Sequence, residues 1–181
     1  MELYLEQGYE ATTVAQIAER AGLTERTYFR HFKDKREVLF SGSPVFVESV
    51  LRAVRSTPLT VSPLDTVVDA FISTSFVFFD PRRHLVVQRQ SVINANPVLQ
   101  ERELIKMSSL TAALFDELRV RGVAESVSRL AAEVGVLILK VAFENWVNDT
   151  AEVTLSELLS ITARQLRSLS DDETALSRAR R

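Results

Sequence analysis

Apolar residues recur three and four positions apart over most of this 181-residue chain, a spacing that places them on one face of an α-helix. The clearest run lies between 64 and 79, and Asp80-Pro81 ends it. Further helices are expected over residues 82–94, 98–121, 126–148 and 155–169, and the residues beyond 169 have no apolar face. The pattern predicts a helical bundle over 41–170 and a frayed tail over 171–181.

The first 40 residues follow a different pattern, made of short helices with marked ends. Gly8 closes a helix over 1–7, and Thr13 with Gln16 forms a capping box that opens a second helix. Gly22 ends that second helix, and Thr24 caps a third after a short turn. Two short helices joined by so tight a turn form a helix-turn-helix.

The third helix has two unlike sides. Tyr28 and Phe32 stand four residues apart and can complete a small core, whereas Arg26, Arg30 and Lys33 fall on the other side. Between positions 20 and 36 there are six cations and two anions. Because such a cluster is also typical of a solvated helix face, charge alone does not identify a nucleic-acid partner.

Composition narrows the fold and the chemistry. Glycine and proline are scarce, at five each, and no Asn-Gly or Asp-Gly turn is present, so the fold class is expected to be all-α. The absence of cysteine excludes disulfides, thiol catalysis and thiolate metal sites. With two histidines and no nucleophile pattern, no metal, cofactor or enzymatic activity is expected. No apolar run is long enough to cross a membrane and nothing resembles a signal peptide, so we expect a cytoplasmic protein without a membrane partner.

The helix over 126–148 is apolar around nearly its whole circumference, with Lys140 the only charge in "VGVLILKVAF". Such a helix needs cover on more than one side. One side can face its own bundle, and the other, together with leucines of 155–169, is expected to face a symmetry-related copy. The alternative is a thick monomeric bundle. The predicted homodimer interface comprises Val134, Leu137, Ile138, Val141, Leu155, Leu158, Leu159 and Leu166.

The stretch "GYEATTVAQIAERAGLTERTYFRHFKDKREVL" resembles the DNA-binding domain of TetR-family transcriptional regulators. The matching residues are Gly8-Tyr9, Thr12-Thr13-Val14, Ile17-Ala18, Ala21-Gly22-Leu23-Thr24, Thr27-Tyr28-Phe29, Phe32, Lys35 and Glu37. The resemblance implies a three-helix DNA-binding domain over 1–40, whose third helix enters the major groove of a palindromic double-stranded operator. In that groove Arg26 is expected to pair with guanine and Glu25 to accept from cytosine. The expected DNA contacts are Thr13, Thr24, Glu25, Arg26, Thr27, Phe29, Arg30, His31 and Lys35.

Two features depart from the family pattern. Phe29 stands where the family usually has a tyrosine whose hydroxyl reaches a phosphate, so Phe29 offers apolar contact only. Members normally have most of a helix before the equivalent of Leu3-Tyr4, so the first helix is expected to be truncated. Thr13 and Lys35 resemble the family's phosphate contacts, although Thr13 is also a helix cap and Lys35 can be a solvated lysine. The alternative function is therefore a helical interaction protein that has lost DNA binding.

In TetR-like regulators the C-terminal helices enclose a ligand pocket, and the ligand changes the separation of the DNA-reading heads. The resemblance thus implies a ligand-binding and dimerisation domain over 41–170, in a repressor that a small-molecule effector releases. The stretch "RRHLVVQRQSVINANPVLQERELIKMSSLTAALFDEL" looks like the C-terminal domain of mycofactocin-associated TetR-type regulators, which implies an acyl-CoA-like effector. An apolar drug-like or aromatic effector is the alternative. The expected ligand contacts are Phe71, Phe76, Phe79, Arg89, Phe115 and Phe143.

Overall fold

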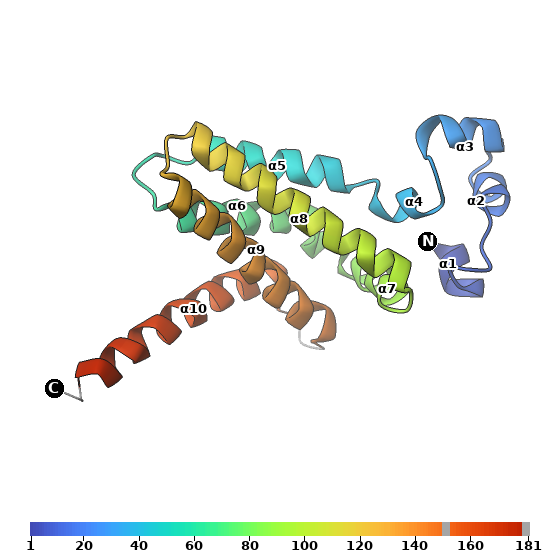
Figure 1. Cartoon of the computed structure of the whole chain (residues 1–181). Coiled ribbons are helices and arrows are strands. Elements are labelled where there is room, and N and C mark those ends of the chain that lie inside the picture. Colours follow the sequence, from blue (N-terminus) through green and yellow to red (C-terminus); the bar gives the residue numbers. More distant parts are fainter. Residues whose placement is uncertain (150–152, 179–181) are drawn as a thin grey trace.

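The computed structural model describes residues 1–149 and 153–178, and within them the chain forms helices and no strand, which confirms the all-α class. The N-terminal part contains α1 (Glu2–Gln7), α2 (Val14–Arg20), α3 (Glu25–His31) and α4 (Arg36–Phe40). The C-terminal part contains α5 (Ser43–Ser56), α6 (Pro63–Phe78), η1 (Asp80–Arg82), α7 (Arg83–Asn94), α8 (Pro97–Val120), α9 (Glu125–Asn148) and α10 (Leu155–Arg178). The N-terminal helices stand at one end of an elongated bundle, with the end of α10 at the other (Figure 1). None of the described helices is both long and apolar enough to span a membrane.

Local signals in the sequence define the ends of the short helices. Thr13 accepts from the Gln16 backbone N–H at 3.2 Å, and the Gln16 side chain accepts from the Thr13 N–H at 2.9 Å, so the predicted capping box is confirmed. At the other end of α2, Gly22 adopts a φ of 67°, which glycine tolerates without steric cost. The Leu23 N–H then donates to the Ala18 carbonyl at 2.8 Å and closes the helix. This ending directs the chain into the turn before α3.

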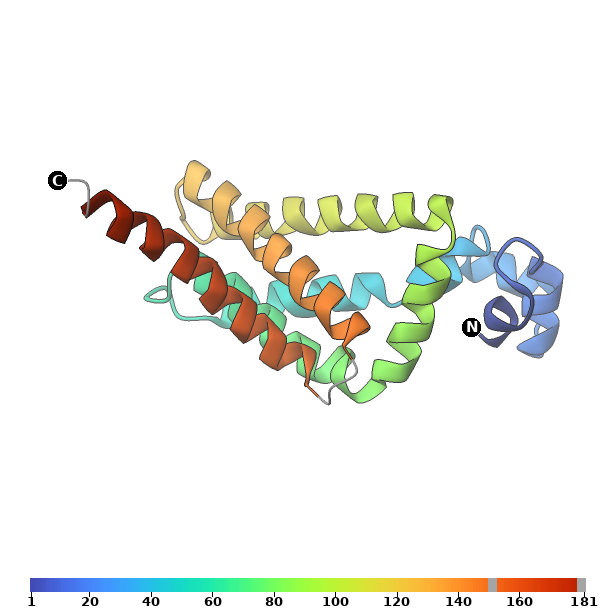
Figure 2. The same ribbon diagram turned by 90° about the horizontal axis from the view of Figure 1, so that it is seen from below.

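The main core lies between α5, α6, α8, α9 and α10, and α9 and α10 run obliquely to α5 and α8 (Figure 2). Its centre is formed by fully buried side chains of α6, α8 and α9, including Val67, Phe71, Leu114 and Trp146. The helices predicted over 64–79, 82–94, 98–121 and 126–148 are confirmed to within one residue at each end. The amphipathic spacing is sufficient for this result because each helix buries one continuous face.

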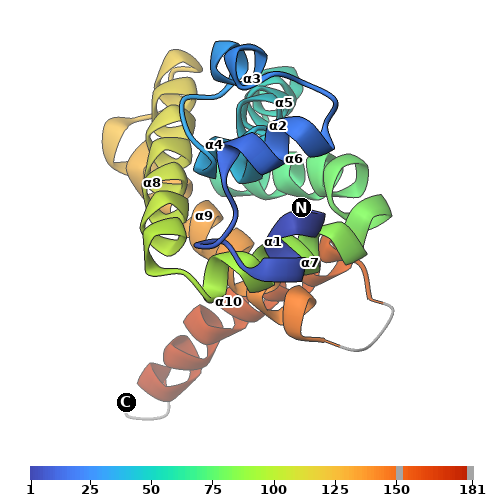
Figure 3. The same ribbon diagram turned by 90° about the vertical axis from the view of Figure 1, so that its right-hand side faces the viewer.

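A second, smaller core joins the two parts of the chain. It combines Tyr4, Tyr9, Leu39 and Phe40 of the N-terminal part with Val92, Ile93 and Leu99 from α7 and α8. Figure 3, which looks onto the N-terminal helices, shows α7 and α8 passing close to α1 and α4. The N-terminal helices are therefore attached to α7 and α8 through shared apolar side chains as well as through the chain itself.

The last helix is longer than the sequence analysis predicted. The expected end was near Leu169, with fraying from 171, whereas α10 continues to Arg178. The predicted end of the helix was wrong because the absence of an apolar face does not end a helix, whereas fraying of the tail stays a prediction. The segment after Leu169 contains no glycine or proline, and Glu, Ala, Leu and Arg all favour the helical backbone. Residues 179–181 of the predicted tail lie outside the described residues.

Candidate nucleic-acid interface and effector region

Helix α3 presents a polar and cationic side to solvent. Thr24 precedes it, and its hydroxyl accepts from the Thr27 N–H at 3.2 Å and fixes the start of the helix. Tyr28 holds the inner side in place, being 2% exposed and donating from its hydroxyl to the Asp34 carbonyl at 2.9 Å. The predicted core role of Tyr28 is thereby confirmed. A helix anchored from beneath in this way projects its remaining side chains outward in fixed directions.

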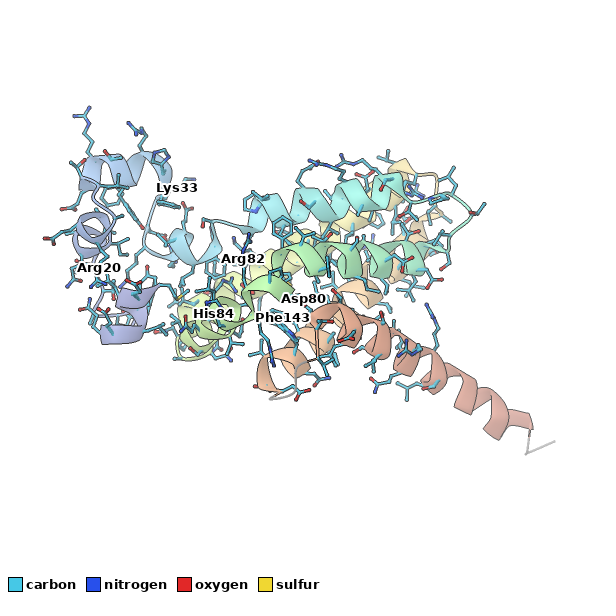
Figure 4. All side chains as sticks on the ribbon, turned by 180° about the vertical axis from the view of Figure 1, so that it is seen from behind. Arg20, Lys33, Asp80, Arg82, His84 and Phe143 are labelled. Atoms are coloured by element: carbon cyan, nitrogen blue, oxygen red, sulfur yellow. The ribbon has the colours of Figure 1, made fainter. Side chains whose placement is uncertain are left out.

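The outward side chains of α3 include Arg26, Arg30, His31 and the half-exposed ring of Phe29. Arg30 Nη2 lies 3.4 Å from His31 Nε2. Across residues 1–149 and 153–178, the Arg26 and Lys33 side chains form neither a hydrogen bond nor an ion pair. The cationic groups of α3 and the turn after it are therefore available to an external anion. Figure 4 shows Lys33 on this outer end of the molecule.

Other cations of the 20–36 segment are engaged within the fold. Arg20 forms ion pairs with Glu2 at 3.1 Å and Glu6 at 3.2 Å, which attach α2 to α1. Arg36 donates from Nε to Asp34 at 2.9 Å, and its hydrogen bonds lower the pKa of the Asp34 carboxyl. Only part of the positive charge counted in the sequence therefore contributes to an external surface.

Lys35 was predicted to contact a phosphate, and its position contradicts that role. Its ammonium donates to the carbonyls of Tyr9, Glu10 and Thr12 at 2.8, 3.1 and 3.0 Å, and lies 4.4 Å from the centre of the Tyr9 ring. An ammonium has three donors, and all three are used here. Lys35 instead ties the start of α4 to the loop between α1 and α2.

The other predicted DNA contacts keep their status as predictions. Thr13, Thr24 and Glu25 are exposed and Thr27 is half-buried, so their side chains lie at the surface beside Arg26. The hydroxyls of Thr13 and Thr24 are both engaged as helix caps. The sequence analysis correctly predicted which side of α3 is exposed. It could not show that Lys35, unlike the residues on that side, is engaged within the fold.

Cationic side chains also hold the junction between α4 and the larger domain. Arg89 Nε donates to the Leu39 carbonyl at 2.7 Å, and Lys106 Nζ donates to the Phe40 carbonyl at 3.0 Å. Both cations lie over the Phe40 ring, at 4.9 and 4.6 Å from its centre. The last carbonyls of a helix lack partners within it, so these donors cap the C-terminus of α4. Burial, and then the charge of Arg102, lower the pKa of Lys106 to about 8.

The six predicted ligand contacts are not brought together. Phe71 is fully buried in the core, Phe76 is 68% exposed, and Arg89 lies at the junction described above. Phe115 packs under Arg129 at 4.8 Å, on another part of α8 and α9. Only Phe79 and Phe143 meet, with ring centres 5.9 Å apart. Helical spacing had placed several phenylalanines along α6 but could not show which of its faces they occupy.

The predicted dimer interface is corrected in part. Three of its residues belong to the protomer's own core: Ile138, Leu155 and Leu159. A stripe of incompletely buried apolar side chains, here called the α9 stripe, runs along one side of α9 at intervals of three and four residues. It consists of Val127, Leu130, Val134, Leu137 and Val141. Leu137 is 52% exposed, and Leu158 and Leu166 of α10 are half-buried.

Among the described residues no group of three or more His, Cys, Asp or Glu side chains is arranged to hold a metal ion. Asp80 accepts from the Leu155 N–H at 2.8 Å and from the Ser156 hydroxyl at 2.6 Å. Its two oxygens therefore hold the start of α10.

Comparison with known proteins identifies the N-terminal part. Residues 1–41 match the family model of bacterial regulatory proteins of the tetR family. The HTH-type transcriptional regulator TcmR of Streptomyces glaucescens is 44% identical over 71 residues, which span 39% of this chain and 31% of TcmR. The HTH-type transcriptional activator FasR of Mycolicibacterium smegmatis is 26% identical over 154 residues, spanning 82% of this chain and 68% of FasR.

Two solved structures share the fold over nearly the whole chain. One is Thermus thermophilus FadR, a TetR-family transcriptional repressor in complex with lauroyl-CoA, with a TM-score of 0.56 and 22% identity, covering 92% of this chain and 88% of FadR. The other is the TetR-family regulator PfmR, also of Thermus thermophilus, with a TM-score of 0.51 and 22% identity, covering 92% of this chain and 93% of PfmR. At this identity the likeness establishes the helical architecture.

Proposed function

The chain belongs to the TetR family of bacterial regulatory proteins, and on that premise we propose that it is a homodimeric, DNA-binding transcriptional regulator, a repressor that a small apolar or acyl-CoA-like effector releases from a palindromic operator. The observation that carries the proposal is the outer side of α3, where Arg26 and Arg30 are exposed on a helix that Tyr28 anchors from beneath.

Each exposed side chain of α3 suits a particular contact in a major groove. Arg26 can donate two hydrogen bonds to the O6 and N7 of guanine, and Glu25 can accept from the N4 of cytosine. Phe29 has no donor and can pack against a thymine methyl group or a sugar. Arg30 and Lys33 are exposed further along the helix and in the turn after it, and each can donate to a phosphate. The first set supplies sequence discrimination and the second supplies affinity.

A dimer fits both the operator and the exposed apolar surface. Helix-turn-helix dimers read two half-sites about 34–36 Å apart, and the two-fold axis of the protein matches that of a palindrome. The α9 stripe offers a surface that a second copy can cover through an isologous contact. The tip of α3 and the α9 stripe belong to different parts of the chain, so dimerisation leaves the reading helices accessible.

The junction at α4 supplies a route from the effector to the DNA-binding helices. Arg89 and Lys106, on α7 and α8, grip the C-terminal carbonyls of α4. A ligand that binds one arrangement of α7 and α8 more tightly than another therefore biases the position of α4. The named proteins of similar sequence or structure include an activator, FasR, and a repressor, FadR. Whether this chain represses or activates is therefore decided by measuring transcription, as described below.

The test is a mobility-shift titration of the protein with a palindromic duplex from its own upstream region, repeated at rising salt. We expect affinity to fall steeply with salt concentration because phosphate contacts release counterions. Arg26→Ala should lower discrimination at one base pair per half-site by about 1–3 kcal/mol. Arg52→Ala, which removes an exposed cation on α5, is the control and should leave binding unchanged.

Two outcomes would change the interpretation. Uniform weakening by Arg26→Ala on all duplexes would mean that Arg26 touches phosphate. No shift at low salt would favour the alternative, a helical interaction protein without DNA binding. Transcription from the same promoter with and without the protein then gives the sign of regulation.

A further inference from the structure

Five aromatic rings form a continuous path across the C-terminal domain, here called the aromatic seam. Phe46 of α5 lies 6.0 Å from Phe78 and 5.0 Å from Phe79 between ring centres. Phe79 lies 5.9 Å from Phe143, which in turn lies 5.9 Å from Trp146. The rings come from α5, the end of α6 and the C-terminal half of α9, and Figure 4 shows Phe143 in the middle of the molecule beside Asp80.

Two rings of the aromatic seam also line hollows in the surface. Phe78 lines a groove of about 300 Å³ between α5 and α6, whose walls also include Ser49, Ala53 and Val77. Trp146 lines a hollow of about 210 Å³ next to Asp80. Three rings of the seam, those of Phe78, Phe79 and Phe143, are half-buried. Phe71, about two turns before Phe78 on α6, is by contrast fully buried.

Trp146 carries an unusual feature for a core residue. It is 1% exposed, and within the described part of the chain its indole Nε1–H has no hydrogen-bond acceptor. Buried donors are normally paired, and an unpaired one is destabilising. The indole ring is held in place by Phe143 on one side and by the Arg83 guanidinium, whose centre lies 5.6 Å from the ring centre. A buried, unpaired donor on a ring that adjoins other aromatic rings is suited to the acceptor of an apolar ligand.

We propose that the aromatic seam is the effector site, and that it takes a flat or elongated, neutral molecule whose single carbonyl accepts from Trp146 Nε1; this inference rests on the proposed function. Aromatic rings pack against apolar ligand surfaces edge to face or stacked. The five side chains of the seam carry no charge, so the body of a ligand among the rings is expected to be apolar and neutral, whereas Arg83 lies beside Trp146 at one end. A carbonyl next to an apolar body occurs in aromatic ketones and in acyl thioesters, and the thioester's phosphate-bearing end would remain outside the seam.

The experiment uses calorimetric titration of the full chain with 2-acetylnaphthalene and with 2-isopropenylnaphthalene, a hydrocarbon of nearly the same shape in which a CH2 group replaces the carbonyl oxygen. The ketone should bind the wild-type protein about fivefold or more tightly, as one hydrogen bond to a buried donor predicts. Trp146→Phe keeps a ring and removes the donor, so the preference should fall to about one. Phe143→Leu should weaken both ligands, and Phe76→Leu, an exposed phenylalanine outside the seam, is the control that should change neither.

A second measurement works on the unaltered fold. Trp146 is the single tryptophan of the chain, so labelling with 5-fluorotryptophan gives one fluorine resonance, which the ketone should shift at the concentrations that bind. Lauroyl-CoA is titrated in parallel, and binding with the same shift would assign an acyl thioester as the source of the carbonyl. Equal affinity for ketone and hydrocarbon, binding without a shift, or no binding of any probe would overturn the proposal.

Failure of this inference is distinguishable from failure of the proposed function. A ligand-free protein that shifts its duplex but binds none of the probes refutes the aromatic seam alone. A protein that binds the ketone through Trp146 yet never shifts DNA refutes the regulator and leaves the binding site standing.

Discussion

Gly135→Ala tests the close approach of α9 to α6 at the centre of the bundle. A Cβ at Gly135 would overlap Val67 Cγ1 and would lie 3.2 Å from Val67 Cβ, which is also a tight contact. Val67 is fully buried, and a β-branched side chain on a helix has essentially one rotamer, so its methyl group cannot turn away. Either α6 and α9 separate locally or the Val67 side chain becomes strained.

Two effects of known size compete in this substitution. Removing a glycine from a helix interior stabilises the helix by about 1 kcal/mol. Overpacking a close-fitting core costs about 1–3 kcal/mol, and a contact this short belongs in the upper half of that range. We therefore expect a net loss of about 1–2 kcal/mol, since the steric term exceeds the propensity term. For a chain of this length such a loss lowers Tm by about 2–8 °C.

The assay is thermal unfolding followed by far-UV circular dichroism, with all variants at one protomer concentration because dimerisation couples to stability. Gly42→Ala is the matched control, since Gly42 has a negative φ of −77° and a methyl group added there would meet no atom within 4 Å. Its Tm should stay close to that of the wild type. Val67→Ala removes the clashing methyl groups, so Gly135→Ala should cost less in that background. A Gly135→Ala protein at least as stable as the wild type would refute the steric argument.

Three further predictions address the dimer, Lys35 and Lys106. Leu137→Glu should give monomers by light scattering, whereas Val120→Glu, at an apolar and more exposed site on α8 outside the α9 stripe, should not. Lys35→Met should lower the free energy of unfolding by about 1–2 kcal/mol, because three carbonyls lose a charged donor. It should leave the salt dependence of DNA binding unchanged, whereas loss of a phosphate contact would reduce that slope by about one. The pKa of Lys106 is lowered to about 8 in the folded state. As the pH rises, Lys106 therefore loses its proton at a lower pH in the folded state than in the unfolded state. Stability measured by denaturant titration should therefore rise above about pH 8 in the wild type relative to Lys106→Met; an identical pH profile would contradict this.

Much of the helix-turn-helix follows from residues that are neighbours in the chain. The Thr13–Gln16 box, the positive φ of Gly22 and the Thr24 cap act within four residues, so the sequence is enough to locate α2 and α3. The same holds for the long helices, because an apolar residue every three or four positions specifies a helix and its buried face. The end of α10 was misjudged because polarity was read as a stop signal in a segment that has no helix breaker.

Contacts between distant residues decided the roles that the sequence left open. Lys35 looked like a solvated or phosphate-binding lysine, and only the fold brings the carbonyls of Tyr9, Glu10 and Thr12 around its ammonium. Arg89 was placed with the ligand, and it instead donates to a carbonyl 50 positions earlier in the chain. Nothing in the local spacing of charges distinguishes these possibilities.

The sequence by itself therefore determined the helices, the helix-turn-helix and the side of α3 that faces solvent, since hydrogen bonds and capping within a helix depend on residues a few positions apart. Tertiary structure decided which apolar faces close the core and which remain uncovered: Ile138 is buried against its own bundle, while Leu137, its neighbour, is exposed. It also brought Phe46, Phe79, Phe143 and Trp146 into one aromatic seam from three helices. Packing of this kind depends on the crossing of whole helices, which no short stretch of sequence encodes.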